Sequence, residues 1–386
     1  MALTVNTNVA SLTSQRNLSG SQDALKTSLE RLSTGLRINS AKDDAAGLAI
    51  SERFSAQIRG LNQGVRNAND GISLAQTAEG ALGEVTNNLQ RIRELAVQAS
   101  NATNTSTDRA ALQNEVSALI AEIDRVATQT AFNGTKLLNG GFTGAVFQIG
   151  ANAGDSITID SIANSTASNL GNQMTTIITA AGTITEITDL SALAADAIKI
   201  STGSVSVGLA AIASASSYQE RAGQIVAAIN DKTGTTGVFA YINSANSIVL
   251  QSETVTAAFI VSGASLSETG VASAAASVTV TGQVLSGLSV EQYGSAQTAI
   301  ALVDSALNTI NTTRATLGAV QSRFESAVAS QQTTSENLAA SRSRIQDADF
   351  ASETANLAKA QILQQSGIAM LAQANAIPQN VLALLQ

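Results

Sequence analysis

The chain of 386 residues is long enough for two or three domains of ordinary size. It contains no His, no Cys, no Trp and one Pro, so the commonest general base, the thiolate nucleophile and nearly all transition-metal sites are excluded. The formal net charge of -8 disfavours sequence-independent binding of nucleic acid, which needs a basic surface.

These counts leave open an enzyme that works with carboxylates alone, but no pair of acidic residues stands out as such a site. We therefore predict no catalytic residue, no cofactor and no metal. No segment has the basic start and long apolar core of a secretory signal peptide. The C-terminal run after Lys359 carries no charged side chain, yet amides interrupt it too often for a membrane span, at Gln364, Gln365, Gln373, Asn375, Gln379 and Asn380.

Helical spacing begins near the N-terminus. An amphipathic stretch closes near Ser33-Thr34-Gly35, with leucines at Leu18, Leu25, Leu29, Leu32 and Leu36. A much longer apolar seam follows, in which successive members are four or three residues apart. Only Glu79 places a charged residue where the pattern calls for an apolar one. Its members are Phe54, Ile58, Leu61, Val65, Ala68, Ile72, Ala75, Leu82, Val85, Leu89, Ile92 and Ala96. A shorter helix is predicted next, with Leu112, Val116, Leu119, Ile123 and Val126.

The middle of the chain has a different pattern. Alternation from Phe142 to Ile159, with turns at Gly150 and Gly154, predicts a β-hairpin. Residues 171–284 are rich in Ser, Thr, Ala and Gly, with short alternating runs at 247–250 and 277–281 and one helix predicted at 218–231. This composition indicates a small mixed α/β domain inserted into a helical protein.

Residues 295–386 return to helical spacing. The seam consists of Ile300, Val303, Leu307, Ile310, Leu317, Phe324, Val328 and Leu338, with polar interruptions at Arg314, Gln321, Gln331 and Ser335. A lone helix of this length would expose its whole apolar stripe. We therefore predict a mainly α fold in which both chain ends pair as a long antiparallel helical bundle or coiled coil. Polar residues within such a seam commonly fix its register.

Several segments resemble bacterial flagellin. They are RLSTGLRINSAKDDAAGL (31–48), AFNGTKLL (131–138), FQIGAN (147–152), SRSRIQDADFA (341–351), QILQQ (361–365) and VLALL (381–385). All lie in the first or last part of the chain, and the middle third does not contribute to the resemblance.

The resemblance implies a structural subunit that polymerises with copies of itself into the hollow flagellar filament. It implies inner-tube helices at 1–42 plus 346–386, a helical bundle with the hairpin at 43–170 plus 285–345, and a variable outer surface domain at 171–284. Polymerisation residues expected on this basis are Leu29, Leu32, Leu357, Leu371, Leu382 and Leu385.

The resemblance also implies partners and a location. The chain is expected to be secreted to the bacterial flagellum without a cleaved signal peptide. Its C-terminal helix would be held by a flagellar export chaperone, and filament cap and hook-associated proteins would contact the polymer. A hook–filament junction protein, which shares the helical ends, remains an alternative, although the segments at 147–152 and 89–95 favour flagellin. A surface adhesin or secreted enzyme with a helical stalk is a more remote one.

Residues 89–95 also resemble the flagellin stretch that the vertebrate sensor Toll-like receptor 5 reads. The implied receptor-binding residues are Gln90, Arg91, Leu95 and Glu115. On a helix that advances about 100° per residue, Arg91 and Leu95 share a face that differs from the face of Leu89, Ile92 and Ala96. We therefore expect Leu95 to lie off the core stripe.

Glycines recur inside the long predicted helix, at Gly60, Gly64, Gly71, Gly80 and Gly83. Each costs roughly 1 kcal/mol relative to Ala in a helix interior. Two explanations stay open at this point: tolerated weak spots, or close approach between helices in the filament.

Overall fold

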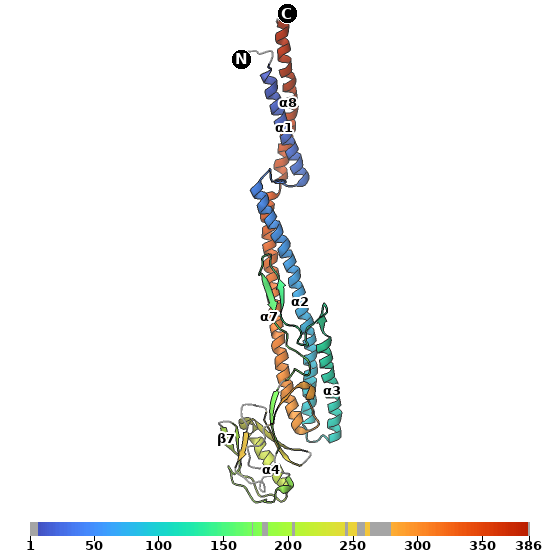
Figure 1. The fold of residues 1–386 in the computed structure, drawn as a ribbon, viewed down its shortest axis with the longest axis vertical. Helices are drawn as coiled ribbons and strands as arrows, with labels where there is room; N and C mark the ends of the chain where they lie inside the picture. Colours follow the sequence, from blue (N-terminus) through green and yellow to red (C-terminus); the bar gives the residue numbers. More distant parts are fainter. Residues whose placement is uncertain are drawn as a thin grey trace. The chain divides into compact units, whose positions relative to one another are not determined.

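The computed structural model describes residues 7–171, 173–179, 184–202, 205–243, 246–252, 259–262 and 279–384. The chain is mainly α-helical, with small sheets in its middle third (Figure 1). The mainly helical fold class with an inserted α/β domain is confirmed. Among the predicted features, the start of the run at 277–281 and Leu385 fall outside the described residues.

The chain divides into two compact units, and α2 (Ala45–Ala99) and α7 (Tyr293–Gln346) contribute to both. The first unit contains Met1–Asn69, Gln148–Ile157 and Phe324–Gln386. The second contains Asp70–Phe147 and Thr158–Arg323. The domain boundaries expected from the sequence divide the chain in another way, into terminal helices, helical bundle and outer domain. They stay predictions.

The two terminal helices belong to the first unit. Helix α1 (Val9–Thr34) is capped by Asn8, whose side chain accepts from the Ser11 N–H, and it ends at Gly35 with φ 72°. Helix α8 (Phe350–Leu384) packs along α1, so the two ends of the chain meet (Figure 1). Two hydrogen bonds join the far ends of this pair: Asn8 Nδ2 donates to Ala374 O at 2.8 Å and Ser11 Oγ to Asn375 Oδ1 at 2.7 Å.

In the second unit, α2, α3 (Ser106–Gln129) and α7 share a core. Helix α3 begins with a capping box in which Thr105 and Asp108 satisfy each other's backbone N–H groups. The predicted seam is confirmed there, because Ala75, Leu82, Val85, Leu89, Ile92 and Ala96 are fully buried, as are Val303 and Ile310 of α7.

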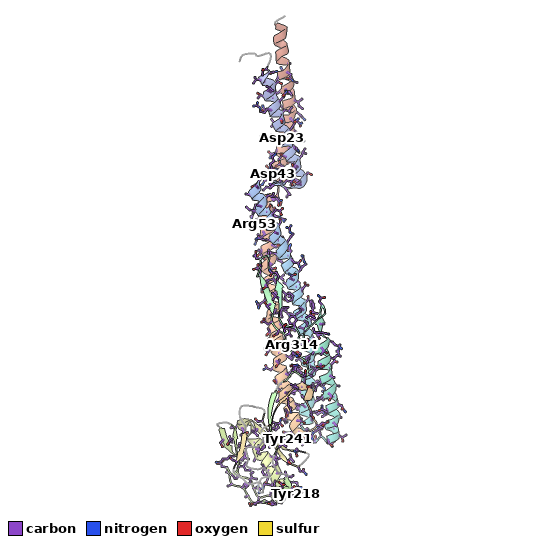
Figure 2. All side chains as sticks on the ribbon, viewed as in Figure 1. Asp23, Asp43, Arg53, Tyr218, Tyr241 and Arg314 are labelled. Carbon is purple, nitrogen blue, oxygen red and sulfur yellow. The ribbon has the colours of Figure 1, made fainter. Side chains whose placement is uncertain are left out.

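The polar interruptions of the seam meet each other. Glu79 Oε2 accepts from Gln321 Nε2 at 2.9 Å, and Glu79 Oε1 lies 3.9 Å from Arg314 Nη2. The single polar residue in the α2 seam is thus matched by two polar residues in the α7 seam. One of these two, Arg314, is labelled in Figure 2. Such a cross-helix polar layer is satisfied in only one register.

Two short strand pairs follow α3. Strands β1 (Ala131–Phe132) and β2 (Thr135–Lys136) flank a turn in which Asn133 and Gly134 both have positive φ. Strands β3 (Ala145–Gln148) and β4 (Ser156–Ile159) pair, which confirms the predicted hairpin.

The turn of this hairpin lies against α2 within the first unit. A Cβ on Gly64 would lie 1.8 Å from Ile149 O, and one on Gly60 2.9 Å from the Ala151 Cβ. Asn67 Nδ2 donates to Gln148 O at 2.7 Å beside them. Gly60 and Gly64 are therefore explained by the chain's own hairpin, whereas Gly80 and Gly83 face open space.

In its described residues, the inserted domain has two antiparallel sheets. One has the order β11-β5-β9-β8, from Thr279–Gln283, Gln173–Thr179, Ile248–Ser252 and Val238–Ile242; the other has the order β10-β6-β7, from Phe259–Ser262, Lys199–Thr202 and Val205–Gly208. Helix α4 (Tyr218–Asp231) covers the residues predicted for it. The described elements also include α5 (Thr233–Thr236) and the 3-10 turn η1 (Ile184–Glu186), and the 3-10 turn η2 (Leu285–Gly287) follows the inserted domain.

This domain has a core of its own, formed by Ile184, Ile187, Leu193, Ile198, Ile200, Leu209, Ile212, Ala222, Ile225, Ile229, Val238, Ala240, Ile248 and Leu250. Arg221 of α4 is completely buried and donates to the carbonyls of Ala213 and Ser191. The chain enters and leaves on paired strands, because Gln173 lies opposite Gln283.

Candidate functional site: the terminal helix pair and the α2–α3 surface

The contact between α1 and α8 is narrow. Among the side chains described on them, up to residue 376, the well-buried ones are few and mostly small or polar, namely Ser11, Ser28, Glu353, Ala360 and Ala374. The pair therefore buries little of its apolar surface internally.

Large apolar side chains on these helices face outward instead. They are Val9, Leu12 and Leu29 on α1, and Phe350, Ile362, Leu363, Ile368 and Met370 on α8. Ile362 is 64% exposed and Met370 62%. Helical spacing places Ile368 on the side of α8 opposite Ile362 and Met370, so apolar groups point to several sides of this helix. A helix that is apolar on all sides is normally buried on all sides.

Five of the six expected polymerisation residues belong to these two helices. Leu29 is 51% exposed, and Leu32, Leu357 and Leu371 are half-buried. Leu382 belongs to α8, but its side chain and Leu385 fall outside what the structure describes. The more exposed Ile362 and Met370 were not singled out from the sequence, although they lie in the uncharged run after Lys359 that could have drawn attention to them.

A second candidate surface lies where α3 packs beside α2 in the second unit (Figure 1). Arg91 Nη1 lies 2.9 Å from Glu94 Oε2, and Arg91 Nη2 lies 2.8 Å from Glu115 Oε1 of α3. Hydrogen bonds to Glu94 and Glu115 raise the pKa of Arg91 above its ordinary value. Gln90 is exposed beside Arg91, so the structure brings three of the four expected receptor residues to one exposed surface.

A shallow hollow continues along α2 next to these charges. It is lined by Gln90, Arg93, Glu94, Val97 and Gln98. Arg93 Nε donates to Asp304 Oδ1 of α7 at 2.7 Å, which fixes one wall, and Val97 is 51% exposed. Sequence reasoning missed Glu94 and Val97, although both lie within or next to the segment it selected.

Leu95 does not lie where it was expected. Its side chain is 1% exposed, so the prediction that it lies off the core is wrong. The ion pair from Arg91 to Glu115 shows that α3 packs on the Arg91 side of α2. Around the helix, Leu95 lies between that side and the side of the seam residue Ile92. The third helix widens the buried arc of α2, and Leu95 becomes part of the intramolecular core.

Neither surface resembles a catalytic or metal site. Across the described ranges, no group of three or more His, Cys, Asp or Glu side chains is placed to hold a metal ion. Within those same ranges, none of the helices has an apolar stretch sufficient to cross a bilayer.

Comparison with known proteins relates both halves of the helical region to one family. Residues 5–143 match the bacterial flagellin N-terminal helical region, and residues 300–385 match the bacterial flagellin C-terminal helical region. The chain is 41% identical to the B-type flagellin of Pseudomonas aeruginosa over the full length of both proteins.

Solved structures give weaker matches. FliC from Burkholderia pseudomallei is 27% identical with a TM-score of 0.39, covering 66% of this chain and 99% of its own. The flagellar junction protein FlgL from Legionella pneumophila is 17% identical with a TM-score of 0.41, covering 77% of this chain and 99% of its own. The junction-protein alternative is set aside because both family models and the full-length relative are flagellins.

Proposed function

Because the chain belongs to the bacterial flagellin family and is a structural subunit of the flagellar filament, we propose that it polymerises through the pair formed by α1 and α8. The exposed apolar side chains on several sides of α8 carry this proposal. One partner helix covers only one flank of α8, so the remaining flanks need neighbouring copies to bury them.

The lack of charge on α8 supports the same assignment. After Lys359 the helix carries no charged side chain, and its polar side chains are amides and the hydroxyl of Ser366. When copies pack side by side, an unpaired charge at such a position would be desolvated at high cost, whereas amides can pair with one another. Residues 1–42 and 346–386 would thus form the inner tube, residues 43–170 and 285–345 the surrounding bundle, and residues 171–284 the outer surface.

The same helix would also serve in export of the chain. A chain whose C-terminal helix is apolar on several sides needs a protein partner before assembly, which fits a flagellar export chaperone that holds α8 without a cleaved signal peptide. Filament cap and hook-associated proteins would contact the same helices at the ends of the polymer.

Polymerisation can be tested at the two most exposed large apolar side chains that the structure describes on α8. The double substitution Ile362→Asp with Met370→Asp should abolish filament growth from seeds in electron microscopy, because two carboxylates would have to be buried between copies. Leu382→Asp with Leu385→Asp should act in the same way.

The matched control keeps the positions and changes only the shape. Ile362→Leu with Met370→Leu should still polymerise, since both residues stay apolar. The far-ultraviolet circular dichroism of each variant monomer should match that of the parent monomer, except for any change in the contribution of the terminal helices. Filaments of normal length from the aspartate variant would exclude α8 as the assembly surface.

We further propose that the surface of Gln90, Arg91, Glu94 and Glu115 is read by Toll-like receptor 5 on the free monomer. The Arg91 guanidinium is held between two carboxylates in a fixed orientation, which suits polar recognition by a receptor. Leu95 contributes to this surface by supporting it from beneath rather than by touching the receptor.

Arg91→Ala should therefore reduce receptor signalling in a cell reporter assay while the monomer stays folded. Arg125→Ala is the matched control, because Arg125 is also exposed on the helical bundle and pairs with Glu122 at 2.5 Å. Arg125→Ala should signal at the level of the parent chain. Equal signalling by both variants would remove Arg91 from the receptor site.

A further inference from the structure

Strand β8 is an edge strand of the four-stranded sheet in the inserted domain. Its neighbour in that sheet is β9, in an antiparallel register that places Ala240 opposite Leu250. In such a pair, alternate residues direct both of their backbone groups away from the neighbouring strand. The outward residues of β8 would therefore offer N–H and C=O groups to any further strand that came alongside.

Ala240 is one of these outward residues, and both of its backbone groups are already bound. Asn230 Nδ2, near the end of α4, donates to Ala240 O at 3.0 Å. Ala240 N in turn donates to Asn230 Oδ1 at 2.7 Å. A side-chain amide carries the same donor and acceptor as a peptide group, so Asn230 stands where a residue of a further strand would pair.

Val238, two residues earlier in the strand, is bound in a similar way. Thr233 Oγ1 donates to Val238 O at 3.0 Å, and Val238 N donates to Thr236 Oγ1 at 3.2 Å. Both threonines belong to α5, which lies between α4 and β8 in the chain. The side chains that cover this edge thus come from the segment that leads into the strand.

The covered strand has the composition of a segment that pairs readily. Its sequence, VFAYI (238–242), combines aromatic and β-branched residues and lacks charge, Pro and Gly. The side chains of Val238 and Ala240 are fully buried, whereas Asn230 lies at the surface. Removal of the Asn230 amide would therefore open the backbone of an apolar strand to solvent.

We propose that Asn230, Thr233 and Thr236 form an edge cap, which prevents β8 of one copy from pairing with β8 of a second copy. A filament holds many copies close together, so an open edge would meet the same edge of another copy at high effective concentration. Two β8 strands can pair antiparallel about a two-fold axis, because each supplies the donors and acceptors that the other needs. The edge cap occupies those groups within the chain.

Asn230→Ala removes the larger part of the edge cap and should make the free monomer associate. The parent chain and the variant are compared without seeds by sedimentation over a range of concentrations. The variant should form dimers at concentrations where the parent chain is monomeric. Association through α1 and α8 would be common to both chains, so the comparison does not depend on how the filament grows.

Hydrogen exchange at Ala240 locates the contact. In dilute Asn230→Ala this N–H has lost its acceptor and should exchange about tenfold faster, which corresponds to the loss of one hydrogen bond. At high concentration its exchange should slow again, because a second strand supplies a new acceptor. If Asn230 only stabilised its own chain, exchange at Ala240 would stay fast at every concentration.

Asn230→Asp is the matched control. Its carboxylate can accept from Ala240 N, but it cannot donate to Ala240 O, so part of the cap is lost. It also places a negative charge on the edge, and charge on an edge strand opposes pairing. This variant should stay monomeric. Association equal to that of Asn230→Ala would overturn the proposal, since lower stability and not an open edge would then be the cause.

Asn230→Ser gives a second opening of the edge and decides the question if Asn230→Ala does not fold. Serine keeps a polar side chain at the surface but is too short to bind both backbone groups of Ala240. It should associate in the same concentration range as Asn230→Ala. Sedimentation like that of the parent chain in every folded variant, or association that leaves Ala240 exchanging fast, would overturn the edge cap.

Discussion

Leu95 and Val97 lie two positions apart on α2, yet one is 1% exposed and the other 51%. The difference comes from what packs on each side of the helix. Leu95 lies between the α7-facing seam and α3, whereas Val97 lines the open hollow beside Gln90. The two residues therefore have different roles in the molecule, despite similar apolar side chains.

Truncating these two side chains should separate those roles. Leu95→Ala should lower the free energy of unfolding by about 2–5 kcal/mol, because it leaves a cavity in a packed core. Val97→Ala should stay within about 0.5 kcal/mol of the parent chain. Urea unfolding followed by circular dichroism measures both. Equal stability of the two variants would mean that α3 does not close over Leu95 in solution.

This result also bears on receptor experiments. A loss of signalling in Leu95→Ala would combine destabilisation with any loss of contact, whereas Arg91 lies at the surface, where ion pairs contribute little to stability. Arg91 is thus the residue at which recognition can be separated from folding.

At the scale of elements, the hairpin and α2 are fitted to each other. Gly60 and Gly64 lie one turn apart on α2 and face Ala151 and Ile149 of the hairpin turn. The close approach of the hairpin backbone at Gly64 leaves no room for a methyl group. Docking of the hairpin therefore explains why glycine is present there despite its cost in a helix.

Alanine substitutions should change the stability of the chain in opposite directions at Gly64 and Gly80. Gly64→Ala should destabilise the chain, by about 1–3 kcal/mol if the hairpin turn shifts to relieve the overlap with Ile149 O. Gly80→Ala, where nothing lies within 4 Å, should stabilise it by about 0.5–1 kcal/mol. Thermal unfolding of the two variants decides this. Stabilisation at Gly64 as well would show that the hairpin turn is not seated on α2.

The polar layer is a second fit between elements. Glu79 on α2 meets Gln321 and Arg314 on α7. A shift of either helix by one turn would leave these groups facing apolar neighbours. The layer thus opposes wrong registers of two long helices whose apolar repeat is otherwise nearly uniform.

At the scale of the whole molecule, the inserted domain has its own core and a single paired entry and exit. Gln173 and Gln283 are opposite each other on antiparallel strands β5 and β11, so the chain could be rejoined there by a short linker. Contacts to α7 are local: Tyr241 packs edge-on against Tyr293 at a centroid distance of 6.5 Å, and Gln251 donates to Thr298.

Deleting residues 175–280 with a short linker should therefore leave filament formation intact, since the seam of α2 and α7 lies outside the deleted part. Tyr293 would lose its ring partner, so Tyr293→Ser is included, and the full-length chain with Tyr293→Ser is the control. Electron microscopy after seeding is the measurement. A monomer that keeps its helical signal but forms no filament would give the outer domain a part in holding copies together.

The sequence by itself determined the features that depend on local periodicity. The apolar repeat of three and four predicted the long seam, the alternation between Phe142 and Ile159 predicted the β3–β4 hairpin, and residues 218–231 were recognised as one helix. The family could also be recognised from contiguous segments. The sequence likewise pointed to the ends of the chain as the assembly surface to be tested.

Only the tertiary structure decided which residues the neighbouring elements cover. Burial of Leu95 depends on α3, the need for glycine at position 64 depends on a loop that follows much later in the chain at Ile149, and the partners of Glu79 come from the other end of the chain. Periodicity describes the faces of one helix, whereas the number of faces that become buried depends on how many other elements pack against it. That number is set by contacts between residues far apart in the sequence, which a local pattern does not contain.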